Sequence, residues 1–103
     1  MIGDKDLDIM NDGNSNAGLV QQMQAVAEKL GDGKFFRKER EGIEDDHIPF
    51  AESGVNVLDV IDFTYGPNNA YWHTAQDTMD KLSEHSFQVV GDVVLGLVNE
   101  LDR

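Results

Sequence analysis

His73, in the run Tyr71-Trp72-His73-Thr74, is the residue whose type and neighbours point most clearly to chemistry. A neutral imidazole can bind a divalent metal ion, and carboxylates such as Asp45 and Asp77 could orient it or accept protons. A catalytic metal site needs about three protein ligands and an open position for water. The structural alternative is a histidine bonded to a loop carbonyl, and spacing alone favours that interpretation.

Further metal ligands are scarce in this sequence. The other histidines are His47 and His85, there is no cysteine, and neither a His-Glu-x-x-His motif nor a paired-cysteine spacing occurs. We expect both histidines at surface or first-turn positions. The acidic stretch 4–9 fails the EF-hand pattern, because Ile9 stands where the turn needs glycine and Ser15 where a bidentate glutamate belongs. Residues 4–16 are therefore expected to form a solvated loop.

Five motifs occur in order along nearly the whole chain: Met1-Ile2-Gly3-Asp4, Asp45-Asp46-His47-Ile48-Pro49-Phe50, Gly54-Val55-Asn56-Val57-Leu58, Tyr71-Trp72-His73-Thr74 and Asp77-Thr78-Met79-Asp80-Lys81. Together they resemble the carboxyl-terminal part of the zinc aminopeptidases of metallopeptidase family twenty-eight, the group that includes the glutaminyl cyclases. The resemblance implies an α/β fold with part of a mostly parallel sheet flanked by helices, as in the phosphorylase/hydrolase-like zinc exopeptidases. Residues 1–103 would be a single unit, the carboxyl-terminal portion of an incomplete catalytic domain.

The resemblance also implies roles for particular residues. The histidine matching His73 is the last zinc ligand, the aromatic residue matching Trp72 lines the substrate pocket, and the acid matching Asp45 belongs to the hydrogen-bond network around the substrate in the cyclases. The other ligands and the glutamate that acts as general base lie upstream in the family, one ligand directly before the position of Met1. Zinc and catalysis are thus expected of a longer parent. This chain alone is expected to be inactive and to pack against the missing amino-terminal half.

Two positions bear on the branch of the family. Asp59 stands where the animal cyclases usually carry a histidine, and Trp72 replaces the tyrosine common in aminopeptidases, which favours the cyclases. The expected function of the parent is that of a zinc-dependent aminopeptidase that hydrolyses amino-terminal peptide bonds of a peptide substrate. The alternatives are a glutaminyl cyclase that forms pyroglutamate and, for this chain alone, a non-catalytic acidic α/β fragment.

Charge excludes some partners. Twenty acidic and eight basic side chains give a formal charge of −12, whereas nucleic-acid and anionic-membrane binding need clustered Lys and Arg. No apolar stretch approaches the roughly 20 residues of a membrane span. The first 15 residues are too acidic for a signal peptide.

Two amphipathic helices are expected to support the site. Apolar residues recur at helical spacing from Leu19 to Leu30, with Ser15 or Asn16 as the cap and Gly31 or Gly33 as the end. Ser83 or Ser86 can cap a second helix. Its predicted apolar stripe consists of Phe87, Val90, Val94, Leu97, Val98 and Leu101. Glycines at 91 and 96 suggest close packing of that helix against a sheet.

The site itself is expected to lie on shorter elements. Asp46 is predicted to cap a short helix with Pro49 in its first turn and Gly54 after its end. The β-branched run 55–61 is predicted to be a buried parallel strand. The loop 63–71 would then deliver His73 at the carboxyl end of that strand, where open α/β sheets bind ligands. Asp77 is expected to cap a turn or helix rather than to touch metal.

Overall fold

Helix α1 (Ala17–Lys29) forms where the sequence predicts it in the computed structural model, which describes residues 1–102. Asn16 caps it, because its side-chain oxygen accepts a hydrogen bond from the Leu19 N–H at 3.0 Å. The chain leaves the helix through Gly31, which has a φ of 82°. The buried face of α1 consists of Val20, Met23 and Ala27.

Helix α3 (Glu84–Leu101) is capped by Ser83, whose hydroxyl accepts a hydrogen bond from the Ser86 N–H. The predicted stripe is only partly right. The buried face consists of Ser86, Val89, Val90, Val93 and Leu97. Phe87, Val98 and Leu101 instead have 46%, 53% and 50% of their surface exposed. Both sides of this helix carry aliphatic residues, so periodicity alone did not decide which side the core covers.

The helix α3 glycines also behave differently from the prediction. A Cβ at Gly96 would lie 2.8 Å from Cγ1 of Val26, so this glycine allows α1, and not a sheet, to approach closely. A Cβ at Gly91 would have no neighbouring atom within 4 Å, so close packing does not require this glycine.

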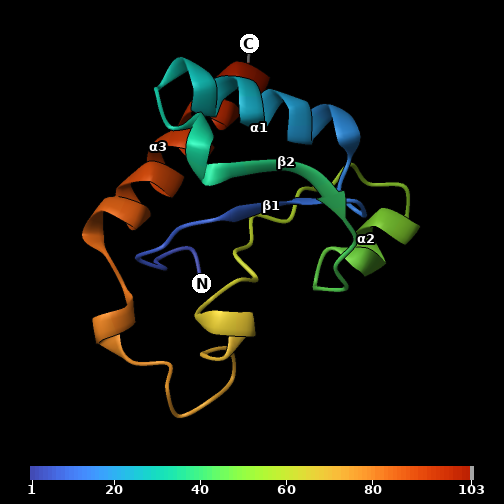
Figure 1. Cartoon of the computed structure of the whole chain (residues 1–103). Coiled ribbons are helices and arrows are strands. Elements are labelled where there is room, and N and C mark those ends of the chain that lie inside the picture. The colour runs from blue at the N-terminus through green and yellow to red at the C-terminus, as the bar shows by residue number, and fades with distance from the viewer. Residues whose placement is uncertain (103) are drawn as a thin grey trace.

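Strands β1 (Ile9–Asp12) and β2 (Phe36–Glu41) form a two-stranded parallel sheet, in which Ile9 pairs with Phe36. In Figure 1, α1 lies along this sheet on the side of β2. The core between helices and sheet consists of Leu7, Ile9, Met23, Ala27, Phe36, Val89, Val90, Val93 and Leu97. The predicted α/β class with a parallel sheet and flanking helices is confirmed, but the predicted loop 4–16 contains β1.

The predicted strand 55–61 is wrong for this structure. The segment carries no regular secondary structure and runs beside β1 with few backbone bonds: Ile61 O accepts from the Met10 N–H at 2.9 Å, and Val57 O accepts from the Asn16 N–H at 2.7 Å (Figure 1). Val55 is 53% exposed. The apolar run thus has aliphatic side chains on both faces, but within residues 1–102 β1 is the only strand beside it.

Helix α2 (Ile48–Glu52) follows β2 and has a proline in its first turn, as predicted. The predicted cap at Asp46 is wrong, because the helix begins one residue later with His47 at the N-cap position and no side-chain cap. Gly54, with a φ of 85°, follows its end. Within residues 1–102, no helix combines the length and apolar character that a membrane crossing needs.

Candidate functional site

A pocket of about 410 Å³ gathers most of the residues singled out from the sequence. His73, Trp72, Asp45 and Asp77 all line it, although 28 residues separate Asp45 from His73 in the sequence. Asp46 does not line it. The remaining lining residues are Met1, Asp59, Val60 and Ile61.

His73 presents a free imidazole to this pocket. Its backbone φ is 53°, in the left-handed region that non-glycine residues rarely adopt. Its ring contacts the Trp72 ring edge-on, with centroids 4.3 Å apart, and no other partner of the ring occurs in the described part of the chain. Trp72 is 43% exposed and also packs on Phe63, with ring centroids 5.0 Å apart. The Trp72 side chain therefore forms a wall rather than part of the core.

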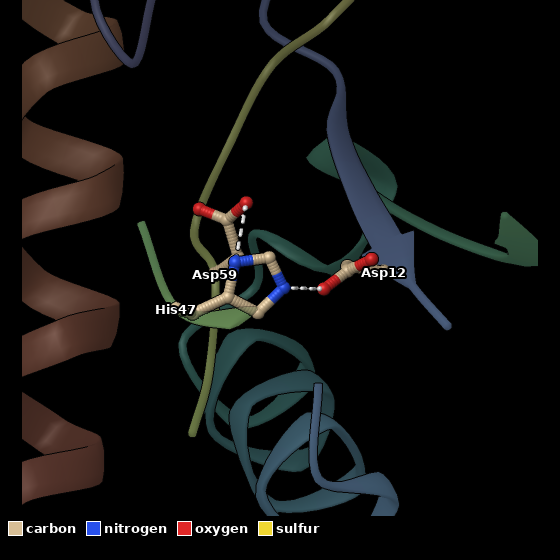
Figure 2. Close-up of side chains that lie close together, drawn as sticks. All are labelled: Asp12, His47 and Asp59. Carbon is tan, nitrogen blue, oxygen red and sulfur yellow. Dashed lines mark ion pairs between the residues drawn. The ribbon is translucent and has the colours of Figure 1, made fainter. Parts of the chain in front are cut away.

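A second group of titratable side chains lies behind the pocket wall. Figure 2 shows the His47 imidazole between the carboxylates of Asp12 and Asp59. His47 Nε2 lies 2.6 Å from Asp12 Oδ2, and Nδ1 lies 3.6 Å from Asp59 Oδ2. The His47 side chain is 7% exposed and the Asp12 side chain is fully buried. The group sits where β1 ends, so it occupies the carboxyl edge of the parallel sheet.

Asp12 ties three segments of the chain together. Its Oδ1 accepts hydrogen bonds from the backbone N–H groups of Asn14 and Ile43, and its Oδ2 accepts one from the Ser15 hydroxyl at 2.8 Å. Ser15 Oγ in turn accepts a bond from the Asp59 N–H at 2.9 Å. Burial alone would raise the pKa of Asp12, but these hydrogen bonds and His47 outweigh it and hold the pKa below its ordinary value. Asp12 is thus ionised and fixes the two segments that carry Asp45 and Asp59.

Asp59 connects this buried group to the pocket. Burial, then the charge of Asp45, raises the pKa of Asp59 to about 6, while His47 opposes the rise. Asp59 and Asp45 both line the pocket, and the nearby Asp45 carboxylate adds to the rise in the pKa of Asp59. The pocket therefore offers one carboxyl group, that of Asp59, which can accept and release a proton near neutral pH.

The Asp12, His47 and Asp59 ligand atoms lie within 4.8 Å of one another, a spacing that metal sites also show. Two ligand atoms around a tetrahedral zinc ion stand roughly 3.3 Å apart, given metal–ligand bonds of about 2.0–2.1 Å. The 2.6 Å contact of His47 with Asp12 is shorter than this, and the two carboxylates face opposite ring nitrogens. The geometry of Asp12, His47 and Asp59 therefore fits direct contacts between the side chains better than a shared metal ion. His73, with its accessible ring, fits a zinc ligand better.

Sequence reasoning missed this network. Both histidines were expected at surface or first-turn positions. His85 is exposed in the first turn of α3, whereas His47 lies at the N-cap of α2 but is buried. The available signal was Asp59 itself, a carboxylate within the apolar run 55–61. A charged residue in such a run needs partners, which the sequence alone did not identify.

Comparisons with known proteins agree with the motifs. Residues 1–98 match the model of Peptidase family M28. The chain is 30% identical over 94 residues to aminopeptidase YwaD of Bacillus subtilis (strain 168), covering 86% of this chain and 19% of that protein. A structure of Acidobacteriales bacterium glutaminyl cyclase matches with a TM-score of 0.92 and 45% identity, covering 96% of this chain and 36% of that one.

Other solved structures are similar at lower identity. A leucine aminopeptidase precursor from Bacteroides thetaiotaomicron matches with a TM-score of 0.83 and 27% identity, over 94% of this chain and 34% of that one. Porphyromonas gingivalis glutaminyl cyclase matches with a TM-score of 0.88 and 26% identity, over 98% of this chain and 40% of that one. The chain thus spans 19% of the curated relative and 34–40% of these structures.

Proposed function

Because this chain belongs to peptidase family M28, we propose that it forms the carboxyl-terminal part of a zinc-dependent glutaminyl cyclase, which converts an amino-terminal glutamine into pyroglutamate. The observation that carries this proposal is the 45% identity to a glutaminyl cyclase over 96% of the chain, which takes in the pocket of Trp72, His73 and Asp45. The aminopeptidase activity expected first from the sequence becomes the second candidate.

His73 is the residue that would hold zinc. Its imidazole lies at the pocket surface and is not tied up by another described side chain. One imidazole does not bind zinc tightly, so the proposal assigns the remaining ligands to other parts of the complete gene product. Zinc, when bound, would polarise the carbonyl group of the substrate that is attacked.

The acidic side chains of the pocket suit an amino-terminal substrate. Asp45, Asp59 and Asp77 line it, and the described lining includes no Lys or Arg. A substrate α-ammonium group is cationic, so these carboxylates would attract and orient it. The raised pKa of Asp59, about 6, lets the Asp45–Asp59 pair take up a proton from that amine near neutral pH. Cyclisation requires this deprotonation, because the amine itself is the nucleophile.

The aromatic wall would hold the glutamine side chain. Trp72 and Phe63 pack edge-to-face and leave an apolar surface beside His73. A neighbouring pocket of about 400 Å³ shares Asp45, Ile61, Trp72 and His73 with the first and extends to residues 42–44. The rest of a peptide substrate would continue into this second pocket.

An aminopeptidase is favoured by the 30% identity to YwaD and by the leucine aminopeptidase structure. The two activities share the recognition of a substrate amino terminus and differ in the nucleophile, which is water in the peptidase. Their products therefore differ. A cyclase releases ammonia from a glutaminyl peptide, whereas an aminopeptidase releases a free amino acid.

The test uses the complete gene product, incubated with a glutaminyl peptide and, in parallel, with a leucyl peptide. We expect ammonia from the first and no free leucine from the second, and we expect a chelator to abolish the activity and zinc to restore it. His73→Ala should remove tight zinc binding, whereas His85→Ala, an exposed histidine in α3, should not. Free leucine without ammonia would establish the peptidase instead. Unchanged zinc affinity in His73→Ala would overturn the zinc site. A stop codon directly upstream of Met1 would support the non-catalytic fragment.

A further inference from the structure

The segment that carries His73 needs to be held in place. Between Asp62 and Thr78 the chain forms no helix or strand beyond the short 3-10 turn Pro67–Asn69, and residues 72–78 are exposed. Within this segment, Asn68, Asn69 and His73 all have positive φ angles, of 53°, 60° and 53°. A residue in this region persists only where its surroundings enforce the conformation. Other contacts must therefore fix the position of His73.

Tyr65 makes those contacts. Its side chain is buried, with 1% of the residue exposed, and lies at the start of the segment. Its backbone N–H donates to Asn69 Oδ1 at 2.9 Å, and its carbonyl oxygen accepts from the Tyr71 N–H at 3.0 Å. Its ring meets the Tyr71 ring edge-on at 5.3 Å. Tyr65 thus fixes the chain on the amino-terminal side of Trp72 and His73.

Asp77 fixes the chain on the carboxyl-terminal side of His73. The Tyr65 hydroxyl donates to Asp77 Oδ1 at 2.6 Å, across 12 residues of sequence. Asp77 also donates its backbone N–H to Thr74 O at 3.1 Å. The hydrogen bond between the Tyr65 hydroxyl and the Asp77 carboxylate raises the pKa of Tyr65 to about 12, so the phenol keeps its proton at physiological pH. The Tyr65–Asp77 bond therefore closes a ring of chain that contains both Trp72 and His73.

We infer that Tyr65 and Asp77 are positioning residues for the metal-binding imidazole, and that Asp77 acts through the Tyr65 hydroxyl rather than as a metal ligand or proton acceptor. This inference rests on the proposed role of His73 as a zinc ligand. Asp77 lines the pocket, but one of its oxygens is already engaged by Tyr65. Partners that orient a metal ligand typically change metal affinity by about 10–100-fold when they are removed.

The test measures zinc affinity in the complete gene product by competition with a chromogenic chelator. Tyr65→Phe keeps the buried ring and removes only the hydroxyl, and Asp77→Ala removes its acceptor. Both should weaken zinc binding by about 10-fold or more. The zinc affinity of Asp77→Asn should stay near that of the parent, because the amide oxygen of asparagine can still accept from the tyrosine hydroxyl. Asp80→Asn is the matched control, since Asp80 is exposed and pairs with Thr78 and Lys81 instead.

Hydrogen exchange gives a readout that does not depend on zinc. The Tyr71 amide, bonded to Tyr65 O, should exchange faster in Tyr65→Phe and Asp77→Ala, while the amides of α3 keep their protection. If His73→Ala abolishes tight zinc binding but Tyr65→Phe and Asp77→Ala bind zinc like the parent, the positioning role is refuted and the zinc site stands. If His73→Ala leaves zinc binding unchanged, the zinc site falls and this inference falls with it.

Discussion

Asp4 and Asp62 form a buried carboxylate pair whose charge should make stability depend on pH. They are 3% and 0% exposed. Asp62 accepts hydrogen bonds from the N–H groups of Asp8 and Thr64, whereas Asp4 Oδ2 has no partner. Burial raises the pKa of Asp62 to about 7, with Asp4 adding to the rise and the two backbone bonds opposing it. The folded protein therefore keeps Asp62 protonated at a pH where an aspartate of ordinary pKa is ionised.

The sign of the effect follows from this raised pKa. The folded state binds the proton more tightly than the unfolded chain, in which an aspartate has its ordinary pKa of 3.8. The stabilisation is fully present below about pH 4 and is lost as the pH rises through about 7. The difference between the two pKa values, at 1.36 kcal/mol per pH unit, corresponds to an upper limit on the order of 4 kcal/mol. Between pH 5 and pH 8 the loss should be roughly 2–3 kcal/mol.

Asp4→Asn is the variant that isolates this pair. Its amide removes the negative charge of Asp4 beside Asp62, while its oxygen still accepts from the Asp6 N–H as Asp4 Oδ1 does. Urea unfolding at pH 5 and pH 8 should show the parent losing roughly 2–3 kcal/mol, and Asp4→Asn should lose less because only the burial of Asp62 still raises its pKa. Asp6→Asn, which changes an exposed neighbouring carboxylate, should show the same pH dependence of stability as the parent. Parallel pH dependence of the parent and Asp4→Asn would refute a contribution of Asp4 to the raised pKa of Asp62.

Three further substitutions test the packing, each by urea or thermal unfolding. Gly66→Ala should destabilise by about 1–3 kcal/mol, because Gly66 has a φ of 79° and a Cβ there would lie 2.6 Å from the Tyr71 ring; equal stability would contradict this close contact. Gly96→Ala should raise the free energy of unfolding by about 1 kcal/mol in a Val26→Ala background, because alanine has the higher helix propensity. In the parent the gain should be smaller, because the new Cβ would meet Val26. An equal gain in both backgrounds would contradict the close approach of α1 to α3. Asn16→Ala should cost about 1 kcal/mol as a lost cap, and no change would mean that its hydrogen bond to Leu19 contributes nothing.

The helices could be predicted from the sequence because their signals are local. A capping residue stands at the start of α1 and of α3, and a glycine with positive φ follows α1. The burial of α3 was harder to predict, because aliphatic residues surround the helix and only the position of α1 and the sheet selects one face. Non-local packing decided that choice.

The strands were predicted less well for a related reason. β1 consists of Ile9, Met10, Asn11 and Asp12, and β2 is mostly charged, so neither shows the alternation of a half-buried strand. Their polar side chains have specific partners instead. Asn11 donates to Lys38 O at 2.8 Å, and Asp8 pairs with Arg37. The run 55–61 had the stronger strand composition, but in the described part of the chain β1 is the only strand beside it.

The pocket residues could be predicted from sequence motifs, whereas the side chains that hold them in place could not. Asp45, Trp72, His73 and Asp77 were all identified from short motifs, and the structure brings them to one pocket. None of these four lies in an α-helix or a strand. Their positions therefore depend on side chains that no motif marked.

Two such side chains carry most of this dependence. Asp12 fixes the segments of Asp45 and Asp59 through Ile43, Ser15 and His47, and it does so from the carboxyl end of β1. Tyr65 fixes the segment of Trp72 and His73 through Asp77. Because each is buried and bonded to residues distant in sequence, disrupting either should displace one wall of the pocket while leaving the helix core intact. The pocket is thus two independently anchored walls, one acidic and one bearing the aromatic and imidazole rings. Under the proposed function, a substrate that bridges the two walls would present its cationic amine to the first and its polarised carbonyl to the second.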